Sequence, residues 1–126
     1  MSAAPSSNAR PLWVLAVALA LSGCREAPDP VVARDGDLSV EMRDYRFEPE
    51  FSSSPSRRVR LEVVNRGRLP HALRLRLRGK ERLSIPTVLP GHRGAATARL
   101  EPGSYRMVCP IGNHEELGMY GVLVVR

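Results

Sequence analysis

Three side chains that can bind a soft metal lie within eleven residues near the end of the chain. Cys109, His114 and Met119 follow one another with the spacing Cys-x4-His-x4-Met. Thiolate and thioether sulfur favour copper, and imidazole also suits this metal. One further imidazole would complete a set of two His, one Cys and a weak axial Met, which is typical of blue-copper electron-transfer sites. This pattern predicts a copper site.

His71 is the residue most suited to supply the second imidazole. It opens the run 71–77, in which leucines alternate with arginines. Strict alternation predicts a strand with one buried face, and the imidazole shares that face with the leucines. We therefore expect the ring to point inward at one end of the fold. His92 follows Pro90-Gly91 in a turn and is interpreted as a solvated loop residue instead.

Short alternating segments separated by turns must position these side chains. The turn signals are Gly combined with Asn or Pro, at 65–67, 89–91 and 101–103. No segment has a sustained helical period, so the pattern predicts an all-β fold, a Greek-key β-sandwich. Tyr45 and Phe47 alternate on an early expected strand and are interpreted as packing residues. The main expected strands are 38–42, 59–63, 71–77, 96–100, 105–109 and 120–125.

The ligands can meet at one end of such a sandwich. Cys109 ends one expected strand, His114 lies in the following loop, and Met119 leads into the last strand. Glu115 and Glu116 lie in the same loop and are interpreted as solvated charge, with a harder metal site as the alternative.

The N-terminal region has the features of a targeting segment. The apolar run Leu12 to Leu21 has ten residues, whereas crossing a bilayer takes about 20, so it fits the core of a signal peptide. Leu21-Ser22-Gly23-Cys24 resembles the bacterial lipobox, in which Cys24 becomes the lipid-modified N-terminus. We therefore expect a signal peptide (1–23), a tether (24–36) and one domain (37–126), with an ordinary signal peptide or a short uncleaved anchor as alternatives.

The two cysteines of the chain then have separate roles. If Cys24 carries lipid, Cys109 has no disulfide partner, and an odd thiol in an exported protein suggests a ligating or reactive role. The alternative is a buried, inert thiol. The net charge of +6 favours anionic partners or an anionic membrane surface. We expect no nucleic-acid partner, a monomer, and a periplasmic or otherwise extracytoplasmic location at a membrane.

Residues 37–126 resemble the cupredoxins, the small blue-copper proteins. The resemblance is carried by Val63–Gly67 before His71, by Leu89-Pro90-Gly91, and by the run Tyr105-x3-Cys109-x4-His114-x4-Met119-x-Gly121. The spacing of this run is similar to that of rusticyanin and auracyanin, more than to that of plastocyanin.

The resemblance implies one copper ion that cycles between Cu(I) and Cu(II). Cys109 is then the thiolate ligand, His71 and His114 are the equatorial imidazoles, and Met119 is the axial thioether. Two positions depart from the family pattern. Ala72 stands where many relatives have an Asn that ties the ligand loops together, and Gly112-Asn113 stands where Pro-Gly is frequent.

The main functional hypothesis is a membrane-tethered electron carrier. Its donor and acceptor would be redox proteins, such as a cytochrome or a membrane oxidase, and His114 would be the electron port beside Ile111, Leu117 and Tyr120. The alternatives are a copper chaperone or storage lipoprotein and a metal-free β-sandwich module. We do not expect an enzyme, because three histidines are too few for the additional copper sites of copper oxidases or nitrite reductases.

Overall fold

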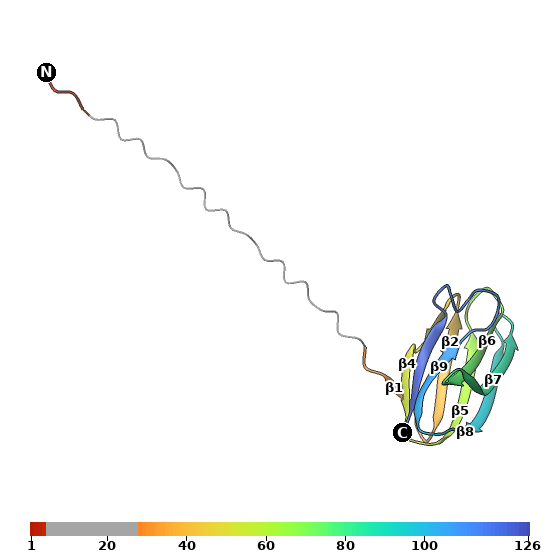
Figure 1. The fold of residues 1–126 in the computed structure, drawn as a ribbon. Helices are drawn as coiled ribbons and strands as arrows, with labels where there is room; N and C mark the ends of the chain where they lie inside the picture. The colour runs from red at the N-terminus through yellow and green to blue at the C-terminus, as the bar shows by residue number, and fades with distance from the viewer. Residues whose placement is uncertain (5–27) are drawn as a thin grey trace.

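The computed structural model describes residues 1–4 and 28–126. The lipobox and Cys24, and most of the predicted signal peptide, therefore lie outside the described residues. The part of the chain from residue 28 onward forms two β-sheets packed face to face (Figure 1). Its strands are β1 (Val31–Val32), β2 (Asp37–Arg43), β3 (Arg46–Glu48), β4 (Phe51–Ser54), β5 (Arg58–Asn65), β6 (His71–Leu77), β7 (Lys80–Val88), β8 (Arg93–Arg99), β9 (Gly103–Val108) and β10 (Tyr120–Val125).

The topology confirms the predicted all-β sandwich. One sheet has the order β1-β4-β10-β9-β6-β7, and the other has the order β3-β2-β5-β8. The chain crosses from β7 to β8 in the second sheet and returns with β9, which pairs antiparallel with β6 and β10. This Greek-key connection brings the end of β9 beside the start of β6, although the two strands are distant in sequence.

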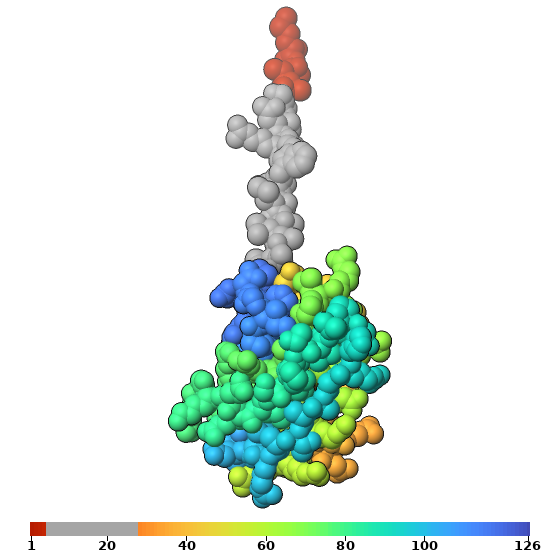
Figure 2. All heavy atoms as spheres, turned by 90° about the vertical axis from the view of Figure 1, so that its right-hand side faces the viewer, coloured from red at the N-terminus to blue at the C-terminus, as the bar shows by residue number. Residues whose placement is uncertain are grey.

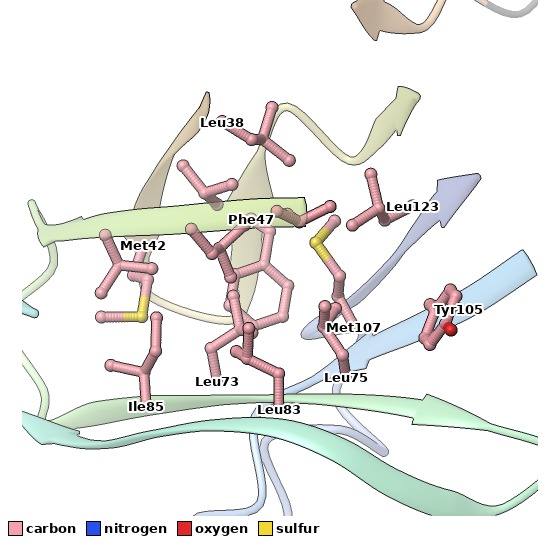
Figure 3. Close-up of a cluster of buried hydrophobic side chains, with 14 of the residues drawn as sticks. Leu38, Met42, Phe47, Leu73, Leu75, Leu83, Ile85, Tyr105, Met107 and Leu123 are labelled. Carbon is pink, nitrogen blue, oxygen red and sulfur yellow. The ribbon is translucent and has the colours of Figure 1, made fainter. Parts of the chain in front are cut away.

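Alternate side chains of both sheets fill the space between them. On β2, Leu38, Val40 and Met42 are buried, while the residues between them face solvent or are half-buried. Figure 3 shows Leu73, Leu75 and Leu83 of one sheet meeting Met42 and Phe47 of the other. Burial of this apolar face is the main stabilising contribution to such a fold. Period-2 alternation therefore determines which face of a strand such as β2 is buried.

Two strands besides β1, namely β4 and β7, were not among those expected from the sequence. β7 contains Pro86 and several exposed polar residues, which an edge strand tolerates because one side of its backbone is unpaired. β4 reads Phe-Ser-Ser-Ser and lacks alternation, yet it pairs in parallel with both β1 and β10. β3 carries Phe47 of the expected early strand, but it has only three residues. Short or unpatterned strands of this kind give a weak local signal.

The folded domain begins earlier than the predicted boundary at residue 37. Val31 and Val32 pair with Ser52 and Ser53, and the following Ala33 is buried. Part of the segment expected to be a tether therefore belongs to the sheet. No helix long and apolar enough to cross a membrane occurs among the residues that the structure describes.

The ends of several strands meet at one pole of the sandwich, opposite the C-terminus (Figure 1). This pole contains the start of β6, the end of β9, and the 109–119 loop that leads to β10. Figure 2 shows the blue atoms of this loop near the green atoms of the segment before β6. The predicted ligands lie here.

Candidate metal centre

His71, Cys109 and His114 form one cluster. Their donor atoms all lie within 4.8 Å of one another, and all three residues are buried. Nδ1 of His71 lies 3.3 Å from Nδ1 of His114, and Sγ of Cys109 lies 3.6 Å from the same His114 nitrogen. The structure therefore brings together three of the four residues that the sequence selected as ligands.

The spacing of these donors fits a single metal ion. Atoms bound to one ion at tetrahedral angles, through bonds of about 2.0 Å to nitrogen and 2.3 Å to sulfur, lie about 3.3–3.6 Å apart. Two of the three separations, 3.3 and 3.6 Å, match this range, and the third, between His71 and Cys109, is within 4.8 Å. Two imidazoles and one thiol are donors that suit copper. The cluster is thus suited to one copper ion.

Backbone hydrogen bonds shape the loop that carries Cys109 and His114. The N–H of His114 donates to the Ile111 carbonyl at 3.1 Å, and the N–H of Met119 donates to the His114 carbonyl at 2.9 Å. The N–H of Cys109 donates to the Met119 carbonyl at 3.2 Å, which closes the loop. Gly112 has φ of +51°, and Gly118 has φ of +108°, conformations that glycine adopts readily.

Met119 lies at the base of this loop and is fully buried. Its backbone is bonded to both Cys109 and His114, as described above. The structure therefore places the residue beside the cluster, and its axial role remains a proposal.

The segment that precedes His71 is held by Asn65. This buried amide donates from Nδ2 to the carbonyls of Leu69 and Val88, both at 2.8 Å. Its Oδ1 accepts the N–H of Gly67 at 2.9 Å. One side chain thus satisfies two backbone groups of the turn and one at the end of β7, which fixes where β6 begins. Ala72 is buried and offers no side-chain hydrogen bond, as expected from the sequence.

Asp44 contacts the far side of the His71 ring and was not expected from the sequence. Its Oδ1 lies 3.1 Å from Nε2 of His71 and accepts the N–H groups of Arg68 at 2.9 Å and Leu69 at 3.2 Å. Burial raises the pKa of Asp44, but these hydrogen bonds outweigh it and leave the pKa below its usual range. Asp44 therefore accepts as a carboxylate near neutral pH.

The same surroundings keep the His71 ring neutral. Burial lowers the pKa of His71, and repulsion by His114 lowers it further, while the hydrogen bond to Asp44 opposes both effects. A neutral ring has one nitrogen with a free lone pair. Because the Asp44 carboxylate can only accept a hydrogen bond, the ring hydrogen lies on Nε2. Nδ1 then carries the free lone pair, which can bind a metal ion on the side of His114 and Cys109.

The expectation that Tyr45 lies on the same strand as Phe47 was wrong. Phe47 is fully buried, but Tyr45 lies in the turn between β2 and β3 with φ of +65°. Its ring meets the His114 ring edge-on, with centroids 5.2 Å apart and an interplanar angle of 84°. The local alternation missed this turn because Asp44 and Tyr45 interrupt the strand pattern by only two residues.

Of the two glutamates in the ligand loop, Glu116 is exposed to solvent, as expected, and Glu115 has structural partners. Glu115 is not simply solvated, because it accepts from Arg76 of β6 at 3.3 Å and from Arg106 of β9 at 3.0 Å. These ion pairs tie the ligand loop to both neighbouring strands. His92 is exposed, contacts the Pro90 carbonyl, and lies outside the cluster.

No family model matches the sequence, and no curated protein is similar to it in sequence. Solved structures are similar to the fold. Auracyanin from Roseiflexus castenholzii is 14% identical with a TM-score of 0.66, over 75% of this chain and 98% of that one. Auracyanin A of Chloroflexus aurantiacus, described as a "blue" copper protein, is 16% identical with a TM-score of 0.59, over 72% and 100%.

A copper-containing nitrite reductase from Thermus scotoductus is also similar, with 22% identity and a TM-score of 0.55. The match covers 86% of this chain but 25% of the enzyme. These likenesses and the strand order show that the domain has the cupredoxin fold. Its His–Cys–His group fits a type 1 copper site.

Proposed function

We propose that this protein binds one copper ion and carries single electrons between redox partners. The ligands are His71, Cys109 and His114, with Met119 as the axial thioether. The observation that supports this most directly is the buried cluster of two imidazole nitrogens and one sulfur at separations of 3.3 and 3.6 Å. Copper bound there supplies one-electron chemistry through Cu(I) and Cu(II).

The donor set suits both oxidation states. Sulfur from Cys109 and Met119 favours Cu(I), whereas two imidazoles are good ligands for Cu(II). The donors lie at strand ends or in a loop closed by backbone hydrogen bonds, so they change position little between the two states. A small rearrangement supports fast electron transfer.

The His114 side of the cluster is the most suitable contact for partners. His114 is only 9% exposed, but Leu117 beside it is 53% exposed and Tyr45 is 39% exposed. A small apolar contact of this kind permits the weak, brief association that redox partners use. We propose a protein donor and a protein acceptor, with the domain held at an extracytoplasmic membrane surface by lipid on Cys24.

We infer an electron carrier rather than an enzyme from the number of metal-binding groups. Among residues 1–4 and 28–126, the one group of three or more His, Cys, Asp or Glu with metal-binding spacing is His71, Cys109 and His114. The third histidine of the chain, His92, is exposed and bonded locally.

Spectroscopy of a soluble form beginning at Arg25 tests this proposal. One equivalent of Cu(II) is added, and visible and EPR spectra are recorded with Cys109→Ser as the control. We expect an intense thiolate-to-copper charge-transfer band and narrow copper hyperfine splitting, both lost in the variant. A colourless protein or ordinary tetragonal Cu(II) would contradict electron transfer, and tight Cu(I) binding without the band would favour copper handling.

A further inference from the structure

We propose that the turn between β2 and β3, formed by Asp44 and Tyr45, positions both imidazoles of the metal site. In the same proposal, Asp44 lowers the reduction potential of the copper bound there. This inference rests on the proposed function. The turn belongs to the sheet opposite the one that carries the ligands. The two adjacent residues of this turn contact different rings. Asp44 contacts the His71 ring, and Tyr45 contacts the His114 ring.

Backbone hydrogen bonds fix the orientation of the Asp44 carboxylate toward the His71 ring. The N–H groups of Arg68 and Leu69 both donate to its Oδ1, so the acceptor cannot rotate away from Nε2 of His71 without losing backbone hydrogen bonds. A carboxylate on the far nitrogen orients the imidazole and makes Nδ1 a stronger donor. A stronger nitrogen donor stabilises Cu(II) relative to Cu(I), and this lowers the reduction potential.

Gly67 shows how closely the chain packs around this contact. A Cβ at this position would lie 2.3 Å from Oδ1 of Asp44 and 2.9 Å from Nε2 of His71. The absence of a side chain therefore leaves the room that the carboxylate and the ring occupy. An alanine here crowds the hydrogen bond without removing either partner, which makes it a useful second probe.

Tyr45 adopts a backbone conformation that a bulky residue rarely takes. Its φ of +65° lies in the left-handed region, and such outliers persist where surrounding contacts hold them. The contact here is the edge-on packing of its ring against His114, at 5.2 Å between centroids. The backbone strain is thus associated with a ring that limits rotation of His114.

Together these contacts supply a connection that Ala72 cannot make. An amide after the first histidine would tie one ligand segment directly to the other. In this chain the Asp44–Tyr45 turn joins them instead, because one of its residues contacts each imidazole.

Asp44→Asn tests the electrostatic part in the copper-loaded protein. We expect Cu(II) affinity to fall about 10- to 100-fold and the reduction potential, measured by voltammetry, to rise. Glu41→Gln is the matched control, because it removes one negative charge from β2, the strand that leads into the turn, without touching a ligand. Gly67→Ala, which keeps the carboxylate, should shift the potential in the same direction as Asp44→Asn.

The outcomes separate this inference from the proposed function. If the wild type lacks the thiolate–copper band, both fail. If the wild type has the band but Asp44→Asn and Gly67→Ala shift affinity and potential no more than Glu41→Gln does, only the role of Asp44 is overturned. The Cu(I) protein adds a further readout, because an Nε2–H proton of His71 should be visible by NMR and move in Asp44→Asn.

Tyr45→Gly and Tyr45→Phe test the second contact. Phenylalanine keeps the ring and should leave the EPR spectrum and the electron self-exchange rate as in the wild type. Glycine relieves the positive φ and removes the ring, so the protein should unfold at no lower urea concentration while its EPR lines broaden and self-exchange slows. Unchanged lines and rate in Tyr45→Gly would overturn the positioning role of Tyr45.

Discussion

Nδ1 of His71 lies 3.3 Å from Nδ1 of His114, although the residues are 43 positions apart in the chain. One ring opens β6 and the other lies in the loop after β9. Because β6 and β9 are neighbours in the sheet, their ends bring both nitrogens to one pole. The hydrogen bond to Asp44 holds the ring hydrogen of His71 on Nε2. Nδ1 therefore has no hydrogen and presents a lone pair to the centre of the cluster.

Substitution of Met119 should change the reduction potential without removing the copper. In blue-copper sites the axial ligand tunes the potential. Met119→Gln introduces a harder oxygen donor that favours Cu(II), so we expect the potential to fall, whereas Met119→Leu removes the donor and should raise it. Voltammetry and the visible spectrum check both variants. Met107→Leu, another buried methionine of the same region, is the control, and a matching shift in it would argue against axial ligation.

Loss of the Glu115 ion pairs should loosen the ligand loop by a modest amount. Glu115 pairs with Arg76 and Arg106, and all three side chains are at least 31% exposed. Ion pairs at such exposure contribute about 1 kcal/mol or less, so Glu115→Gln should lower the free energy of unfolding by that order. Urea unfolding at low and high salt measures it. An equal loss at both salt concentrations would contradict an electrostatic origin.

An alanine at position 121 should destabilise the domain through backbone crowding. A Cβ on Gly121 would lie 2.5 Å from the Glu50 carbonyl oxygen and 2.8 Å from Cε of Met107. The carbonyl belongs to the backbone and accepts the N–H of Val122, so it cannot move freely. We expect a loss of about 1–3 kcal/mol in urea unfolding. Ser104→Ala, at an exposed position of neighbouring β9, should change stability by less than about 0.5 kcal/mol. Equal stabilities of the two variants would contradict the crowding.

Stability should decline in alkali because of Tyr105. Burial raises the pKa of this phenol, as does the nearby Glu101 charge. A group with a raised pKa in the folded state contributes stability that is fully present below its unfolded pKa, near 10 for tyrosine, and that is lost as the pH rises above it.

Tyr105→Phe tests this pH dependence. Phenylalanine removes the alkaline decline together with the hydroxyl hydrogen bond to the Glu101 carbonyl, which is 2.7 Å long. We expect the variant to be about 1 kcal/mol less stable near neutral pH, with a flatter profile above pH 10. Urea midpoints between pH 8 and 11 measure both effects. Parallel profiles for wild type and variant would rule out Tyr105 as the source.

The main strands and the ligand cluster could be predicted because the features that identify them lie within short stretches of the sequence. The alternation in 71–77 identified both β6 and the inward direction of His71, because period 2 fixes side-chain direction along a strand. The donor types of Cys109 and His114 identified their chemistry. Both features can be read within a few residues of the chain.

Other features of the site depend on contacts between distant segments. Asp44 contacts His71 across 27 positions, and nothing near Asp44 in the sequence indicates that contact. The Ser-rich strand β4 forms because β1 and β10 pair with its backbone, which does not depend on side-chain pattern. Tyr45 was misplaced for a similar reason, since its left-handed turn is held by packing against a loop far along the chain.

The short strand β1 determines how the domain responds to mechanical tension. It lies at the sheet edge and is joined to β4 through two residue pairs, with the N–H of Ala33 bonded to the Ser53 carbonyl at 2.7 Å. Because β1 and β4 run parallel, a pull on the chain before residue 31 loads these few bonds in shear. These few bonds should break before the longer pairings of β9 with β6 and β10, so the chain before the sheet can extend without disturbing the strands and the 109–119 loop that carry the cluster.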